Sequence, residues 1–289
     1  MQLDVFNDSR DVMRNDVLSA LQRYGAAGAR RALQALANDY PDDVAQVYFG
    51  SIVNALEGRS TVPFDRHEAA LQARQALSYE VQPAVAHVFP RQSGATWLAP
   101  LWAELAGRAA ALPFRADHAD AHAAPLFLLA ARWAEASDAI SRIASWRRIP
   151  APLCWMTEAP YRLDGLDAAR PLLVELAWLS PSRLDQLLSR LGDACVNTLR
   201  RNFDTSFDGA GDIDDLAWFP AWVLAEKAGL APLFKLAEPS RRNPPERAAK
   251  VMLELLSLER QGRHHELLET RRVLQALNAV LYAAYMKTR

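Results

Sequence analysis

An acidic, glycine-rich segment, residues 204–215, has the clearest arrangement of side chains that could do chemistry. Its oxygen-bearing residues at the first, third, fifth, ninth and twelfth positions are Asp204, Ser206, Asp208, Asp212 and Asp215. A glycine stands at the sixth position, and this is the spacing of a twelve-residue calcium-binding loop. Gly211 departs from that pattern because a branched apolar residue is usual there, and the last ligand is aspartate instead of glutamate. The simpler interpretation is an acidic connection whose aspartates cap the next helix, so we expect no cofactor, with calcium as the alternative.

Two histidines, His118 and His122, are four residues apart and have Asp117 and Asp120 beside them. On one helical face this spacing binds zinc or another transition metal when a third ligand comes from elsewhere. The glutamate that zinc peptidases place next to the first histidine is absent, and a solvated first helical turn is the simpler interpretation. The sequence also contains no nucleophile elbow, phosphate-binding glycine loop or dinucleotide fingerprint. We therefore predict no catalytic residues, and an enzyme with an unrecognised site near these histidines is a minor alternative.

Arginine pairs and tryptophans are the candidates for contact with a partner, and those we select are Arg147, Arg148, Arg200, Arg201, Trp218 and Trp222. Arginines that line a groove bind acidic peptides or a phosphate backbone. Adjacent residues on a helix point about 100° apart, however, so each pair cannot project wholly into one groove. Ion pairs with the 34 acidic residues are the simpler role for these arginines. The two tryptophans would anchor a partner if they were exposed together, whereas core packing is the more common role of this residue.

The amino-acid composition predicts an all-α protein. Of the 289 residues 51% are hydrophobic, which is enough for a sizeable core. Only five isoleucines and seven threonines occur among abundant alanine and leucine, so residues that favour strands are scarce. The net charge of −1 gives no overall attraction to nucleic acid or to an anionic membrane. No apolar run approaches the ~20 residues that cross a bilayer, and the N-terminal residues lack the pattern of a secretion signal, so we expect a cytoplasmic protein.

One spacing pattern occurs twice in the chain, 140 residues apart. An alanine is followed by leucines four and seven residues later and by a proline twelve residues later, and the two sets are Ala29, Leu33, Leu36, Pro41 and Ala169, Leu173, Leu176, Pro181. The small alanine lets a neighbouring helix approach closely, the leucines share its face, and the proline ends the helix. Together with the apolar helix at residues 17–24, the first copy resembles a degenerate tetratricopeptide-type repeat.

This resemblance implies antiparallel helical hairpins stacked as an α-solenoid, that is, a TPR-like superhelix. The helices we expect span residues 10–24, 26–39, 42–57, 66–79, 81–89, 95–111, 117–133, 135–147, 164–179, 181–203, 214–228, 229–237, 244–260 and 263–286. The longer interruptions are residues 58–63, 147–164 and 204–215. The second of these predicts a boundary between an N-terminal half, residues 1–149, and a C-terminal half, residues 150–289, which form two domains or one continuous domain.

Stacked hairpins form extended grooves that serve mainly for recognition. Our hypothesis is therefore a non-catalytic intracellular scaffold or adaptor that binds a protein or peptide on a concave helical-repeat surface. The alternatives are a nucleic-acid-binding helical solenoid that uses the arginine pairs, which we consider less favoured, and the enzyme mentioned above. The helix expected at residues 263–286 ends in a segment that is apolar nearly all round. Either the preceding hairpin or a dimer contact would cover that segment, so we expect a monomer or a homodimer.

Overall fold

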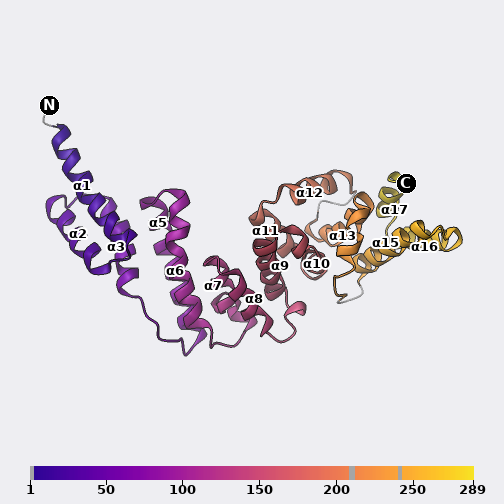
Figure 1. Ribbon diagram of the computed structural model, residues 1–289, viewed down its shortest axis with the longest axis horizontal. Coiled ribbons are helices and arrows are strands. Elements are labelled where there is room, and N and C mark those ends of the chain that lie inside the picture. The colour runs from indigo at the N-terminus through magenta and orange to yellow at the C-terminus, as the bar shows by residue number, and fades with distance from the viewer. Residues whose placement is uncertain (1–2, 208–211, 240–242) are drawn as a thin grey trace. The chain divides into compact units, whose positions relative to one another are not determined.

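The computed structural model describes residues 3–207, 212–239 and 243–289, which contain helices and no β-strand (Figure 1). The all-α prediction is therefore confirmed. The chain divides into two compact units, Met1–Ala139 and Ile140–Arg289, and the division falls within helix α8 (Trp133–Ser141). No helix in the described ranges combines the length and the apolar character that crossing a membrane requires.

Seven α-helices precede α8 in the described part of the first unit: α1 (Leu3–Gln22), α2 (Ala26–Asp39), α3 (Ala45–Glu57), α4 (His67–Ala76), α5 (Gln82–Val88), α6 (Arg91–Ala109) and α7 (Ala123–Leu129). A π-helical segment, η1 (Leu77–Val81), joins α4 to α5, and a 3-10 segment, η2 (Ala116–Ala121), precedes α7. Packing largely follows chain order, because α1 contacts α2, α2 contacts α3, α3 contacts α5, α5 contacts α6 and α6 contacts α7.

The repeated alanine–leucine spacing produces two helices of the same length. Helix α2 and helix α10 (Leu166–Leu179) each have 14 residues, and both of their ends are displaced by the same 140 positions as the sequence pattern. Ala29 in α2 and Ala169 in α10 are fully buried. An alanine at such a position leaves no side chain beyond Cβ to hold a neighbouring helix away, so the backbones approach closely.

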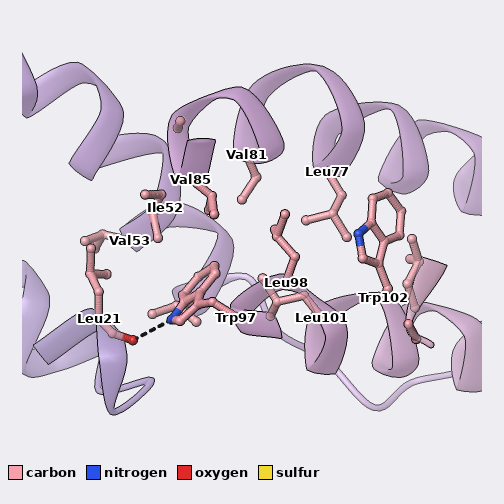
Figure 2. Packing of buried hydrophobic residues seen from close by; sticks show 14 of the residues in the cluster. Leu21, Ile52, Val53, Leu77, Val81, Val85, Trp97, Leu98, Leu101 and Trp102 are labelled. Carbon is pink, nitrogen blue, oxygen red and sulfur yellow. Dashed lines mark hydrogen bonds between the residues drawn. The ribbon is translucent and has the colours of Figure 1, made fainter. Parts of the chain in front are cut away.

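The core of the first unit is built where η1 and α5 face α6. Figure 2 shows Leu77, Val81 and Val85 pointing from one side of this contact toward Leu98 and Leu101 on the other, and all five side chains are buried. Because apolar surface removed from water stabilises the fold by roughly 25 cal/mol per Å², this contact fixes η1 against α6.

A pair of aromatic residues ties the first hairpin to α6. The indole Nε1 of Trp97 donates a hydrogen bond of 2.8 Å to the carbonyl oxygen of Leu21, drawn as a dashed line in Figure 2. The hydroxyl of Tyr24 donates to the carbonyl oxygen of Trp97 at 2.8 Å, and the two rings stack with their centroids 5.2 Å apart. The polar end of each aromatic side chain is thus satisfied while its ring is packed into the core.

The α-helices of the second unit after α8 are α9 (Pro150–Asp164), α10, α11 (Pro181–Leu191), α12 (Ala194–Ser206), α13 (Phe219–Glu226), α14 (Ala231–Phe234), α15 (Pro244–Gln261), α16 (His264–Leu277) and α17 (Ala279–Lys287). Short 3-10 segments are η3 (Trp146–Arg148), η4 (Ile213–Trp218) and η5 (Ala228–Leu230). Helix α9 forms a hairpin with α10, and α15 contacts both α13 and α16.

The prediction of a loop at residues 147–164 is wrong, because helix α9 occupies most of this segment. Pro150 and Pro152 lie in the first helical turn, where a backbone N–H has no partner within the helix in any case. Pro160 lies inside the helix and removes one internal hydrogen bond. The burial of neighbouring residues such as Leu153 and Ala159 offsets that loss.

Four helices predicted as continuous, over residues 117–133, 135–147, 181–203 and 263–286, are each broken in the structure. Gly192 adopts a positive φ of 65° and ends α11, after which Asp193 caps α12. Asn278 separates α16 from α17, because its Oδ1 accepts a hydrogen bond from the Leu281 backbone N–H at 2.8 Å.

The interruption of the helix predicted at residues 117–133 has a related cause, since His122 caps α7 after the 3-10 segment η2. Asn243 caps α15 in the same way ahead of Pro244, because its Oδ1 accepts from the Glu246 backbone N–H at 2.9 Å. Side chains that compete for backbone N–H groups therefore decide where several of these helices begin.

Replacing Ala29 with leucine tests the close approach at α2. The larger side chain has no space at a fully buried position, so we expect Ala29→Leu to lower the free energy of unfolding by about 1–3 kcal/mol. Urea unfolding followed by circular dichroism measures this loss. The matched control is Ala35→Leu at an exposed position of the same helix, and equal unfolding curves for the two variants would contradict the close approach.

Candidate functional site

The structure places the two selected tryptophans differently. Trp222 is 2% exposed and its ring packs against Phe203 and Phe219, with centroids 5.6 and 6.3 Å away. Trp218 is half-buried. An exposed tryptophan pair is therefore not present, although one edge of Trp222 borders a cavity of about 380 Å³ between α13 and α17. Trp222 therefore has the role that is more common for tryptophan, which is packing in the core.

Arg147 and Arg148 bond to groups within the second unit. Arg147 Nη1 lies 2.6 Å from Glu175 Oε1, and its Nε lies 3.4 Å from Glu238 Oε1. Arg148 Nη2 donates to the carbonyl oxygen of Pro239 at 3.2 Å. Burial raises the pKa of the Glu175 carboxyl, and the neighbouring guanidinium of Arg147 and the Glu238 backbone N–H oppose that shift. Arg147 thus compensates a buried carboxylate.

Arg200 bonds to Asp185 and Asp204, and Arg201 differs from it in having a weaker contact. The guanidinium of Arg200 lies 2.7 Å from Asp185 and 2.8 Å from Asp204. Arg201 Nη2 donates to Thr198 Oγ1 at 3.4 Å. Because Arg200 is held by two carboxylates, only Arg201 of this pair is free of an ion pair within the described residues.

The residues of the predicted calcium loop belong to different elements. Asp204 and Ser206 lie in the last turn of α12, whereas Asp212 caps η4 by accepting from the Asp214 N–H at 3.3 Å. Asp215 lies within η4, and the remaining candidate, Asp208, lies outside the described residues. Within residues 3–207, 212–239 and 243–289, no group of three or more His, Cys, Asp or Glu side chains is arranged to hold a metal ion. The calcium loop stays a prediction.

The two histidines of the proposed metal pair do not share a helical face. The backbone kinks at His118 within η2, and His122 follows the segment in extended conformation. His118 Nδ1 lies 3.1 Å from Asp117 Oδ2, and its ring lies 5.6 Å from the ring of His67. Hydrogen bonds from Arg115 and then from His118 hold the pKa of the Asp117 carboxyl below its usual range.

His122 has a structural role as a helix cap. Its Nδ1 accepts a hydrogen bond of 3.2 Å from the Ala124 backbone N–H, and the residue is 7% exposed. Burial, with a smaller contribution from the charge of His67, lowers the pKa of His122 to about 4. The imidazole is therefore neutral at pH 7, which is the form in which Nδ1 accepts this bond.

A groove in the first unit, which we call the α3–α6 groove, has the composition of a binding site. Its volume is about 340 Å³, and its lining residues come from α3, α4, η1, α6 and the segment after α3: Ser51, Asn54, Ala55, Gly58, Arg59, Ala73, Ala76, Leu77, Glu80, Val81, Leu101, Glu104, Leu105 and Arg108. The lining contains both apolar residues and hydrogen-bonding residues. Sites for small ligands and peptide segments combine the same two features.

The π-helical segment η1 forms one wall of the α3–α6 groove. Leu77, Glu80 and Val81 line the groove, and the Gln82 backbone N–H bonds to Leu77 O, five residues earlier. An α-helix through this segment would drive the ring of Pro83 against the carbonyl of the residue four positions before it. The wider turn avoids this clash. Single π turns within α-helices occur frequently at functional sites.

The opposite wall is fixed by charged side chains of α6. Glu104 accepts a bond of 2.8 Å from Arg59 Nε and another of 2.9 Å from the Ser60 backbone N–H. Arg108 Nε donates to the Val62 carbonyl oxygen at 2.8 Å. These bonds hold the segment after α3 against α6. Arg59 is thereby ion-paired with Glu104, and the guanidinium of Arg108 stacks on the ring of Phe64 at 4.0 Å. The terminal nitrogens of both groups make no further hydrogen bond within the described part of the chain, so they remain as donors to a ligand.

Sequence reasoning missed the α3–α6 groove because its polar residues are widely spaced along the chain. Residues 58–63 were expected to be a loop, and they are irregular in the structure, but no local pattern connects Arg59 with Glu104. Pro83 was the available signal for the π turn, since a proline inside a helical pattern requires a local adjustment.

A comparison with protein-family models, with curated proteins and with solved structures finds no significant match to this chain. The residues of the groove must therefore be interpreted from their own geometry.

A pH titration of stability tests the buried cap at His122. The unfolded chain binds a proton at His122 near pH 6.5 and the folded chain only near pH 4, so stability falls as the pH is lowered between these values. At most about 3 kcal/mol of the free energy of unfolding depends on this group. We expect His122→Asn, which keeps a capping oxygen and does not titrate, to flatten that part of the curve in urea unfolding.

The control for this measurement is His264→Asn, at an exposed histidine of the second unit. It should follow the wild-type curve, because the carboxylates that also respond to acid are common to all three proteins. A wild-type curve that coincides with the His122→Asn curve from pH 7 to pH 4 would contradict the buried neutral cap.

Proposed function

We propose that this protein is a non-catalytic adaptor that binds a peptide segment in the α3–α6 groove. The observation that carries the proposal is the combination, in one open groove of about 340 Å³, of an apolar floor with donors and acceptors on its walls. The chain-order packing of α1, α2 and α3 supports the resemblance to stacked repeat hairpins, whose grooves serve mainly for recognition. An inference of function from the fold alone would be weaker evidence, because similar folds serve many functions.

The walls offer complementary groups for an extended peptide. Leu77, Leu101 and Leu105 form apolar surface for a side chain of the peptide. Arg108, which makes no ion pair within the described residues, suits its carboxylate or carbonyl oxygens, and the terminal nitrogens of Arg59, whose charge Glu104 compensates, suit its carbonyl oxygens. The polar groups give orientation and specificity, and the apolar floor contributes most of the free energy of binding.

The selected arginine pairs favour protein binding over nucleic-acid binding. Arg147 and Arg200 are each held by carboxylates at 2.6 to 2.8 Å, so their charges are compensated within the chain. A nucleic-acid surface needs basic side chains that are available to phosphates. We therefore keep the peptide as the proposed ligand.

A substitution that fills the groove tests this function. Ala76 is an exposed residue of α4 that lines the groove, and Gln75 is its exposed neighbour outside the lining. Ala76→Trp should block the groove with little effect on folding, whereas Gln75→Trp adds the same bulk elsewhere. The measurement is selection of a displayed library of random peptides on the full-length protein, followed by titration of the enriched peptides.

We expect peptides enriched on the wild type to bind Gln75→Trp with unchanged affinity and to lose at least about tenfold on Ala76→Trp, which is 1.4 kcal/mol. Circular dichroism establishes that both variants are folded. The proposal is wrong if the selection enriches no sequence, or if Ala76→Trp binds the enriched peptides as tightly as the wild type.

A further inference from the structure

Another cavity of the second unit, separate from the one beside Trp222, has a different chemistry from the α3–α6 groove. Its volume is about 210 Å³, and it lies between α10 and α15, with α13, α14 and the turn after α14 completing its wall. Apolar side chains form most of the lining, including Val174, Leu224, Phe234 and Leu253. We call it the α10–α15 cavity. It is smaller than the ~300 Å³ at which sites for drug-sized ligands begin, so it suits a smaller molecule.

Two lysines are the charged side chains that line the α10–α15 cavity among the described residues. Lys235 and Lys250 lie on its border, and no aspartate or glutamate of the described part of the chain belongs to its lining. The chain has only four lysines among 33 basic residues, so two of the four meet at one small cavity. Lys250 also lies 3.2 Å from Glu246 Oε1, one helical turn earlier, and its side chain is still 46% exposed. Both ammonium groups can therefore reach a ligand at the cavity mouth.

A buried indole of α10 supplies an additional hydrogen-bond donor to the lining of the cavity. Trp178 lines the cavity, is 7% exposed, and its Nε1 has no hydrogen-bond acceptor among the described residues. Buried tryptophan N–H groups usually have a partner, because an unsatisfied buried donor destabilises the fold. An acceptor oxygen on a bound molecule would meet this requirement.

The wall that carries Lys235 is held in place by contacts on its far side. The Glu238 backbone N–H donates to Glu175 Oε1 at 2.9 Å, and Arg148 bonds to the carbonyl oxygen of Pro239 at 3.2 Å. The side-chain amide of Asn243 donates to the carbonyl oxygen of Trp178 at 3.3 Å. These bonds anchor the backbone at Trp178, Glu238 and Pro239, which favours a preformed binding site.

From this arrangement we infer that the α10–α15 cavity binds a small amphipathic carboxylic acid. The apolar body of the acid lies against Val174, Phe234 and Leu253, and its carboxylate lies near Lys235 and Lys250. Charge complementarity selects the anion, because Lys235 makes no ion pair within the described residues and Lys250, although paired with Glu246, keeps an exposed ammonium group beside it. The size of the cavity selects a short aliphatic or aromatic body over a long lipid chain. This site is independent of the proposed peptide-binding groove.

Octanoate is the probe for this inference, and 1-octanol and octylamine are its neutral and cationic counterparts. Isothermal titration into the full-length protein should show binding of octanoate, with the two counterparts bound at least about tenfold more weakly. In ¹⁵N–¹H spectra octanoate should shift the indole resonance of Trp178, which Trp178→Phe identifies. Equal binding of the three compounds, no binding of octanoate at millimolar concentration, or an unshifted Trp178 resonance would overturn the inference.

Substitutions in and outside the lining test whether octanoate binds in the α10–α15 cavity. The double variant Lys235→Ala and Lys250→Ala should weaken octanoate binding about tenfold, because it removes both cations that attract the carboxylate. Lys227→Ala is the matched control, since this exposed lysine lies outside the lining, and it should bind as the wild type does. Leu253→Trp, which fills the cavity while keeping both lysines, should abolish binding. If the double variant and Leu253→Trp, both folded by circular dichroism, bind octanoate normally, the inference is wrong.

Discussion

The close approach of helix backbones is the constraint on which the rest of this structure depends. In the described part of the chain nine α-helices each contain an alanine with no exposed surface, for example Ala29, Ala70, Ala106, Ala124, Ala136, Ala159, Ala169, Ala221 and Ala248. The distance between packed helices is set by the side chains at their contact, so a methyl group permits a short one. When the helices lie close together, the larger leucine and tryptophan side chains around each alanine are buried between them.

Polar residues are accommodated in this packing by specific partners, and they set the ends of the helices. His122, Asp193, Asn243 and Asn278 each cap a helix by accepting a backbone N–H. Each cap satisfies a donor that the helix itself leaves unpaired. The π turn has a steric cause instead, because the ring of Pro83 would clash with the carbonyl four residues earlier in an α-helix, and the chain forms a wider turn that borders the α3–α6 groove.

The all-helical class and many helices could be predicted from the sequence because alanine–leucine periodicity is a local signal. The bounds of α2 match the prediction residue for residue, since Gly25 and Pro41 stand just outside them. Breaks at Gly192 and Asn278 were missed because the apolar periodicity continues across them and only backbone geometry distinguishes a cap from an interior residue. The groove and the cavity were missed for another reason, because Arg59 meets Glu104 only after the chain folds.

Compensation of charge decides which surfaces of this protein can recognise a ligand. Arg147 is occupied by the buried carboxylate of Glu175, and removing it would leave that carboxylate unpaired at 3% exposure. Such a residue supports the fold. Arg108 and Lys235 differ, because nothing in the described structure neutralises their charge. Each borders an apolar hollow of its own unit, where a ligand's oxygen atoms would gain both a charged donor and partial exclusion from water. Two recognition sites of different size can therefore exist in one chain that has a net charge of only −1.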